Sequence, residues 1–212
     1  MTINNSNLQQ IKNDLIGLNS KLLIVTKNQN TDDIKSLIDS GYKLFGENKV
    51  QEAKNKFQFF KSDNIALHLI GPLQTNKVKD ALKIFDTIQT LDRSKLVEAV
   101  HKELKKNKIY KTKEFFIQIN IGDEYQKSGI SKKNVKDFYD YCIFKGLNIK
   151  GLMCIPPLDE DPIEFFREMR KIRDSINLNL LLSMGMSNDY QVALKYQANI
   201  IRVGSKIFEK KT

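Results

Sequence analysis

The chain alternates between two hydrophobic patterns along its length. Short runs rich in apolar and β-branched residues, such as "KLLIVTK" at 21–27 and "EFFIQIN" at 114–120, predict strands, and the intervening segments repeat apolar residues with the helical period of about 3.6. Eight strand-like runs occur, each preceded by a helical segment. Such alternation favours parallel pairing through right-handed crossovers, and eight units are the number at which a sheet closes. We therefore predict an α/β protein with a single (β/α)8 TIM barrel, in preference to an open doubly wound sheet.

Both ends of the sequence bear on how this barrel closes. The helical segment "NLQQIKNDLIGL" at 7–18 comes before the first strand, and the last strand-like run, "NIIRVGSKIF" at 199–208, has no helix after it. We expect the first helix to fill the position that a final helix normally takes. No linker rich in Pro, Gly or Ser interrupts the pattern, so residues 1–212 are expected to form one domain.

The charge and the cysteines limit the kind of protein. The net charge is +10, which favours phosphate-bearing ligands, but 30 of the 35 cations are lysines scattered through helical segments, which argues against a dedicated nucleic-acid surface. Cys142 and Cys154 have no metal or redox spacing and are expected to be buried, reduced thiols. No signal core and no run of about 18 apolar residues is present, so we predict a cytoplasmic protein without membrane contact.

The ends of the predicted strands carry the chemistry. Active sites of such barrels form at the C-terminal ends of the strands, often with a phosphate site after the last two strands. Those positions hold Lys27, Asn48, "SMGMS" at 183–187 and "RVGS" at 202–205. We expect them to surround one mouth.

Two of these segments resemble a phosphate cradle. Ser187 precedes a predicted helix, where free N–H groups favour an anion, and Arg202, Gly204 and Ser205 add a cation, a close backbone approach and a second hydroxyl. Ordinary capping and turn chemistry is the alternative explanation for Ser187 and Gly204.

Lys27 ends the first predicted strand with an amine. Apolar strand residues behind it and a nearby cation would favour the neutral amine, a nucleophile that can form a Schiff base. The alternative is an ordinary solvated lysine.

Other apparent motifs in the sequence do not indicate a functional site. "GPLQTNKV" at 71–78 has the length of a phosphate-binding loop but lacks its second Gly and its Ser or Thr. His68 and His101 are too isolated for a catalytic triad or a metal site, and we expect a packed strand residue and a solvated helix residue.

An ordered series of motifs covers nearly the whole chain. They are "VTK", "GENKVQE", "HLIGPLQTNK", "NIGDEYQKSGI", "GLMCIPP", "LSMGMSNDY" and "IRVGSKIF". In these motifs the sequence resembles the pyridoxal phosphate homeostasis protein family, whose barrel is similar to the cofactor domain of alanine racemase. Lys49 departs from the family pattern, in which an aromatic residue is frequent at that position.

The resemblance implies a role for each matching residue. Lys27 would carry pyridoxal 5′-phosphate (PLP) as a Schiff base, Arg202 would face the pyridine nitrogen, and Asn48 would lie near the phenolic oxygen. The phosphate would be held by Ser187, Gly204 and Ser205. The ring would be lined by two methionines, Met153 and Met184.

Arginine at the pyridine nitrogen cannot protonate it, which weakens the electron sink that catalysis needs. We therefore expect a monomeric PLP carrier that supplies apoenzymes, indirectly adjusts amino-acid and keto-acid pools, and has no robust turnover. One alternative is a racemase-like enzyme with Lys27 as base and an opposing acid such as Tyr125 or His68. Another is a cofactor-free phosphate-binding enzyme.

Overall fold

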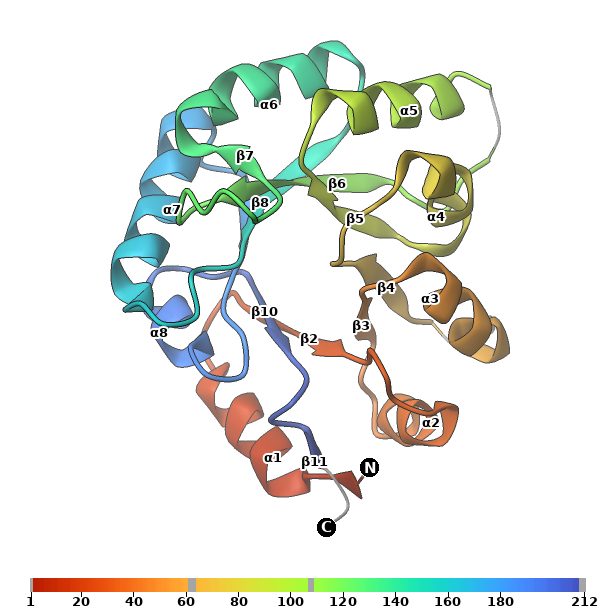
Figure 1. Cartoon of the computed structure of the whole chain (residues 1–212). Coiled ribbons are helices and arrows are strands. Elements are labelled where there is room, and N and C mark those ends of the chain that lie inside the picture. The colour runs from red at the N-terminus through yellow and green to blue at the C-terminus, as the bar shows by residue number, and fades with distance from the viewer. Residues whose placement is uncertain (1, 61–63, 107–108, 210–212) are drawn as a thin grey trace.

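Eight parallel strands lie side by side around a ring (Figure 1). The computed structural model describes residues 2–60, 64–106 and 109–209. The order of the strands is β5-β4-β3-β2-β10-β9-β8-β6, and β6 pairs in parallel with β5, which closes the ring. The TIM-barrel prediction is therefore confirmed. The strands are β2 (Lys21–Val25), β3 (Leu44–Glu47), β4 (Ala66–Leu69), β5 (Thr87–Leu91), β6 (Glu114–Asn120), β8 (Ile149–Cys154), β9 (Leu181–Ser183) and β10 (Ile200–Val203).

Helices surround the ring of strands (Figure 1). Their ends follow local signals: the Asn30 side chain caps α2 by accepting from Asp33 N–H, and Pro162 occupies the first turn of α7, where its missing N–H costs nothing. The helices are α1 (Asn5–Asp14), α2 (Thr31–Asp39), α3 (Val50–Phe57), α4 (Val78–Ile84), α5 (Ser94–Leu104), α6 (Val135–Phe144), α7 (Pro162–Ile176) and α8 (Tyr190–Lys195). Short 3-10 turns span Gln58–Phe60, Thr75–Lys77 and Lys132–Asn134.

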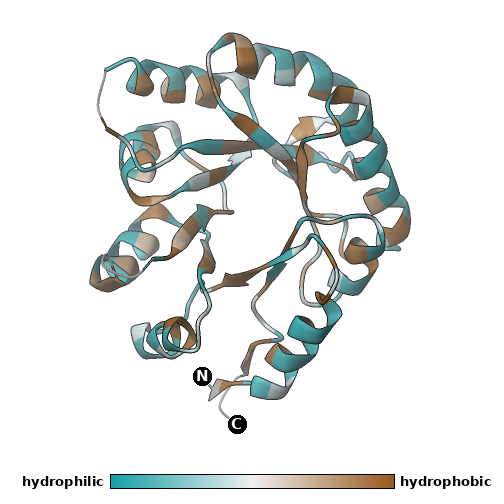
Figure 2. Cartoon of the chain, turned by 180° about the vertical axis from the view of Figure 1, so that it is seen from behind, coloured by the Kyte–Doolittle hydropathy of each residue, from teal (hydrophilic) through white to brown (hydrophobic). Residues whose placement is uncertain are grey.

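The strands bury side chains on both faces. Apolar residues that point outward pack with the helices in a large core, and four that point inward form a small cluster inside the barrel: Leu23, Phe116, Met153 and Ile200. In Figure 2 the strands are largely hydrophobic, whereas hydrophobic and hydrophilic bands alternate along the helices. This alternation of facing residues decides which strand-end side chains can reach the mouth.

Three short strands were not predicted. β7 (Ile130–Ser131) pairs with the end of β6, and β1 (Thr2–Ile3) pairs antiparallel with β11 (Phe208–Glu209). The last predicted strand, 199–208, is therefore two strands separated by a turn that begins at Gly204.

The first helix lies around the barrel in the position that we expected, the one that a final helix normally takes. In Figure 1, α1 lies between α8 and α2. The Asn4 N–H donates to Ile207 O at 2.8 Å, and Asn7 Nδ2 donates to Lys206 O at 2.8 Å. The turn after β10 is thus tied to residues at the other end of the chain.

Cys142 and Cys154 are both free and buried, as predicted. Burial raises the pKa of each thiol to about 12, so both are inert at neutral pH. Among the helices in the described residues, none combines the length and the apolar character needed to cross a membrane.

Candidate functional site

An open cleft of about 460 Å³ lies at the C-terminal ends of the strands. It is bordered by the ends of β2, β3 and β4 on one side and by the segments after β8, β9 and β10 on the other. The structure brings six of the eight candidate residues to this cleft. They are Lys27, Asn48, Ser187, Arg202, Gly204 and Ser205.

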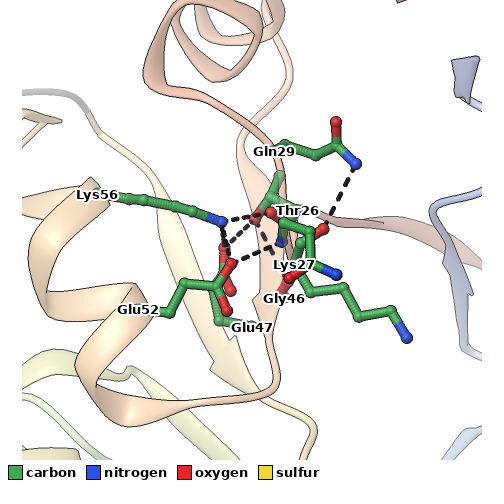
Figure 3. Close-up of polar contacts among 8 residues, drawn as sticks. Thr26, Lys27, Gln29, Gly46, Glu47, Glu52 and Lys56 are labelled. Carbon is green, nitrogen blue, oxygen red and sulfur yellow. Dashed lines mark hydrogen bonds and ion pairs between the residues drawn. The ribbon is translucent and has the colours of Figure 1, made fainter. Parts of the chain in front are cut away.

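Lys27 reaches the cleft because of its place along β2. Leu23 belongs to the cluster inside the barrel, Val25 lines the cleft, and Lys27 follows two residues later at the mouth. Its side chain is exposed, so the desolvation that we expected around it is absent from the protein alone. In Figure 3 this side chain extends away from the polar network behind it.

The backbone around Lys27 is held by a network from β3 and α3 (Figure 3). Lys56 Nζ donates to Thr26 O at 2.6 Å, to Glu47 Oε1 at 3.0 Å and to Glu52 Oε1 at 2.6 Å. Thr26 Oγ1 also donates to Glu47 Oε1 at 2.7 Å. We call these four residues, Thr26, Glu47, Glu52 and Lys56, the strand-end network.

The residue after Lys27 has an unusual conformation. Asn28 has a φ of +61°, and its N–H donates to Glu52 Oε1 at 2.6 Å. Asparagine is among the few residues that tolerate this region. The strand-end network therefore fixes the turn that ends β2, and with it the direction in which Lys27 leaves the strand.

The two carboxylates of this network differ in electrostatics. Glu47 is fully buried, and this burial raises its pKa although Thr26 and Lys56 favour its charged form. Partial burial acts the same way on Glu52, but hydrogen bonds from Lys56 and the Asn28 N–H, together with the Lys56 charge, outweigh it and lower the Glu52 pKa. Lys56 thus supports one carboxylate that resists ionisation and one that favours it.

Asn48 follows β3 and faces the cleft. A Cβ on Gly71 would lie 2.2 Å from Asn48 O, so only glycine allows these two segments to approach so closely. Asn48 Oδ1 is buried and, within the described residues, has no hydrogen-bond partner. A ligand donor in the cleft would satisfy it.

The opposite side of the cleft carries the expected hydroxyls. Ser205 Oγ donates to Ser187 Oγ at 2.9 Å, and the Lys206 N–H donates to the same oxygen at 3.3 Å. In the part of the chain that the structure describes, no acceptor takes the Ser205 N–H. A Cβ on Gly204 would lie 3.0 Å from Val25 O, which keeps the turn close to the end of β2. Because α8 has only six residues, these groups, rather than a helix dipole, would hold an anion.

Arg202 lies at the base of the cleft. Only 4% of it is exposed, and Nη1 and Nη2 donate to Ser183 Oγ at 2.9 Å and to Cys154 O at 2.7 Å. Burial lowers its pKa, but a guanidinium stays charged at neutral pH. No carboxylate among the described residues forms an ion pair with it. A buried positive charge therefore borders the cleft without a directly paired carboxylate among the described residues, and Asp189 acts on it from beyond ion-pair distance.

The methionines lie elsewhere. Met184 is fully buried in the core between sheet and helices and does not line the cleft, whereas Met186 does. Met153 belongs to the cluster inside the barrel. Met153 and Met184 are thus the two candidate cofactor-binding residues that the structure does not bring to the cleft.

Neither proposed opposing acid lines the cleft. His68 is buried and lies 2.8 Å from Gln89 through Nδ1, and burial lowers its pKa to about 4. Tyr125 is fully exposed. His101, expected to be solvated, is partly buried and has Nδ1 2.7 Å from Lys145 O. Within the described residues, no group of three or more His, Cys, Asp or Glu is placed to hold a metal ion.

Sequence reasoning missed several residues that support the site. Ser183 contacts Arg202 directly, and Gln89 contacts Ser183. Glu47 and Lys56 contact Thr26, the residue before Lys27. The signal for Gln89 was present, since it is a polar residue within the buried run "TIQTL". Lys56 carried no such signal in the sequence, because a lysine in a short amphipathic helix normally faces solvent.

Solved structures define the class of protein. Alanine racemase from Clostridium difficile 630 superposes with a TM-score of 0.76 at 14% identity, covering 99% of this chain and 58% of that chain, and so shares the fold. PipY from Synechococcus elongatus PCC7942 gives a TM-score of 0.84 at 26% identity over 96% of this chain and 99% of that chain, and its structure with PLP bound gives 0.83. The chain thus has the barrel fold that these structures share.

Relatives in sequence define the family. Proteins named pyridoxal phosphate homeostasis protein from Aquifex aeolicus (strain VF5) and from Buchnera aphidicola subsp. Schizaphis graminum (strain Sg) are 36% and 37% identical to it. Each match covers 89% of this chain and 86% of the relative. The chain belongs to the pyridoxal phosphate homeostasis protein family. No protein-family model matches the chain.

Proposed function

We propose that this protein binds PLP reversibly as a Schiff base on Lys27 and supplies it to apoenzymes. The observation that carries the proposal is the meeting of Lys27 with Ser187, Gly204 and Ser205 at one cleft. An amine on one side and an anion cradle on the other match an aldehyde that carries a phosphate. Family membership and the PLP-bound structure of PipY support the same ligand.

The remaining groups of the cleft fit PLP as well. Val25, Ile70 and Ile155 provide apolar walls for an aromatic ring. Within the described residues, the buried Asn48 Oδ1 has no donor, and Arg202 borders the cleft without forming an ion pair. A flat ring with polar substituents would offer a donor to the first and a neutral acceptor to the second.

Each residue then has a distinct task. When bound, PLP supplies an aldehyde that condenses reversibly with an amine and releases water. Ser187 and Ser205 would donate hydroxyl hydrogens to the phosphate, and the Ser205 N–H would add a third donor. Arg202 would donate an N–H to the pyridine nitrogen without giving up its proton, which keeps the electron-withdrawing power of the ring low.

Access to Lys27 favours transfer over catalysis. The lysine is exposed at an open mouth, so the amine of a recipient protein has a direct path to it. A racemase-like enzyme needs a second acid or base within reach of the substrate. His68 and Tyr125, the two candidates from the sequence, do not line the cleft. We accordingly propose a monomeric carrier without robust turnover.

Trapping the adduct tests the binding step. Protein loaded with PLP should show a visible absorption band that borohydride abolishes, and peptide mapping should locate the reduced adduct on Lys27. Lys27→Ala should lose the band, whereas Lys49→Ala, which removes a neighbouring exposed lysine, should keep it. An adduct on another lysine in the wild type, retained in Lys27→Ala, contradicts the assignment.

A transfer assay tests the carrier step. Loaded protein is mixed with a PLP-dependent apoenzyme in the presence of a scavenger of free PLP, and recovery of enzyme activity is followed. We expect recovery to exceed that with the same amount of free PLP. Equal recovery in both arms rejects delivery. Turnover of an amino acid by this protein that disappears in Lys27→Ala would favour the racemase-like alternative.

A further inference from the structure

A row of hydrogen bonds crosses the inside of the barrel and ends at Arg202. Arg202 Nη1 donates to Ser183 Oγ at 2.9 Å, and Ser183 Oγ donates to Gln89 Oε1 at 2.6 Å. Gln89 Nε2 lies 2.8 Å from His68 Nδ1. The four side chains come from β10, β9, β5 and β4, so the row joins opposite sides of the barrel.

The row has one direction. Because Gln89 Oε1 accepts from Ser183, its amide nitrogen must face His68, and His68 Nδ1 must accept. His68 is therefore neutral and carries its proton on Nε2. Every bond then donates away from Arg202, and each acceptor is polarised in the sense that stabilises a positive charge at Arg202.

Burial makes this order necessary. Gln89 and Ser183 are fully buried, and His68 and Arg202 are nearly so. Water cannot replace a lost partner there at low cost, so each polar atom depends on its neighbour. Arg202 also lacks a carboxylate partner in the described part of the chain, and Asp189 acts on it only from beyond ion-pair distance.

We propose that Ser183, Gln89 and His68 are positioning residues that fix the Arg202 guanidinium at the base of the cleft. Ser183 and the Cys154 carbonyl hold one N–H of each terminal nitrogen, which sets the plane of the group. The N–H groups that remain are directed by this plane, and Arg202 borders the cleft. The proposal rests on the proposed function only in taking the PLP ring as what Arg202 meets.

A double-mutant cycle tests the proposal with PLP. Gln89→Met removes the link between Ser183 and His68 at similar volume, and we expect it to weaken PLP binding about tenfold. In an Arg202→Met background the same change should alter binding by less than twofold, because there is no guanidinium left to position. Equal weakening in both backgrounds, or no weakening in the wild type, overturns the proposal.

The controls come from the same strands. Thr90 is also fully buried on β5, and its Oγ1 donates to Gly71 O at 2.9 Å outside this row. Thr90→Val should therefore leave PLP affinity within twofold. If Arg202→Met does not fold, Ser183→Ala replaces it: combined with Gln89→Met, it should weaken binding no further than either change alone, and full additivity overturns the proposal.

A measurement without ligand separates this proposal from the proposed function. The chain has only two histidines, so their ring nitrogens can be assigned by 15N NMR. We expect His68 to be neutral and protonated on Nε2 at pH 7, and Ser183→Ala to disturb this tautomer while Thr90→Val does not. The proposed row of hydrogen bonds is overturned if His68 is charged or carries its proton on Nδ1. It is also overturned if the His68 tautomer is unchanged in Ser183→Ala. If His68 shows the expected tautomer but the protein does not bind PLP, the proposed function is rejected, whereas the positioning of Arg202 is not.

Discussion

Two polar networks support the cleft, and they differ in charge and in what they hold. The strand-end network is built from ionisable groups around Lys56 and holds the backbone beside Lys27. The row from Arg202 to His68 passes through neutral groups and holds a side chain. One lies behind the rim of the barrel and the other crosses its interior.

The difference follows from access to water. Lys56 is partly exposed, with 12% of its side chain accessible, so water still reaches it where it joins two carboxylates. Inside the barrel an added charge would be costly, and a row of neutral dipoles stabilises Arg202 instead. The charged strand-end network should therefore be sensitive to loss of one ionic partner. The neutral row should be sensitive to protonation of His68.

Loss of Lys56 should have the largest effect. Lys56→Met leaves Glu47 buried without its cation, and we expect a loss of about 3 kcal/mol in the free energy of unfolding. Since burial raises the Glu47 pKa, the loss should be greater at pH 8 than at pH 5, because protonation of Glu47 at lower pH relieves its unpaired charge. Urea unfolding at the two pH values measures this. Lys54→Met, which removes an exposed lysine of the same helix, should change little.

Acid should weaken the neutral row. The pKa of His68 is about 4 because burial and the Lys21 charge outweigh the opposing charge of Asp86. The unfolded chain therefore binds a proton near pH 6.5 that the folded protein takes up only near pH 4. Stability should fall as pH decreases through this window, by up to about 3 kcal/mol from His68. Urea unfolding of His68→Gln should show a flatter pH profile, whereas a profile that stays as steep as in the wild type contradicts this origin.

Neutralising Glu52 should have a smaller effect. Glu52→Gln weakens its bonds to Lys56 and to the Asn28 N–H, and we expect a loss of about 1 to 2 kcal/mol. Asn28→Gly in that background should recover part of it, because glycine adopts a positive φ without strain. Thermal unfolding of the single and double variants measures this, and a further loss in the double variant would argue against strain at Asn28.

An ion pair outside both networks should matter least. On α6, Lys136 Nζ lies 2.5 Å from Asp140 Oδ2, and more than half of each side chain is exposed. Lys136→Ala should change the free energy of unfolding by no more than about 0.5 kcal/mol, measured by urea unfolding. A loss as large as that of Lys56→Met would show that burial does not distinguish the two pairs.

The barrel could be predicted because its signal is local. Each strand and helix shows its own period, and their alternation fixes the topology. The pairing of β1 with β11 has no such signal, since two-residue strands show no period and the partners lie at opposite ends of the sequence.

The site was predictable only in part. Lys27, Asn48 and the segments after β9 and β10 lie at strand ends, where a barrel gathers its functional groups. Met184 was placed by resemblance, but it follows Ser183, which points into the barrel, so the alternation of a strand turns Met184 toward the helices. Ser183 and Gln89 meet across 94 positions, a distance at which no local pattern reports contact.

The ties between the ends of the chain set an order of assembly. Asn7 and Lys206 are 199 positions apart, yet their bond fastens the turn that carries Ser205. During synthesis this turn can reach its final shape only after the whole ring of strands has emerged from the ribosome. The side of the mouth that we propose to hold the phosphate is thus completed only after the last barrel strand, β10, and the turn that follows it have been made.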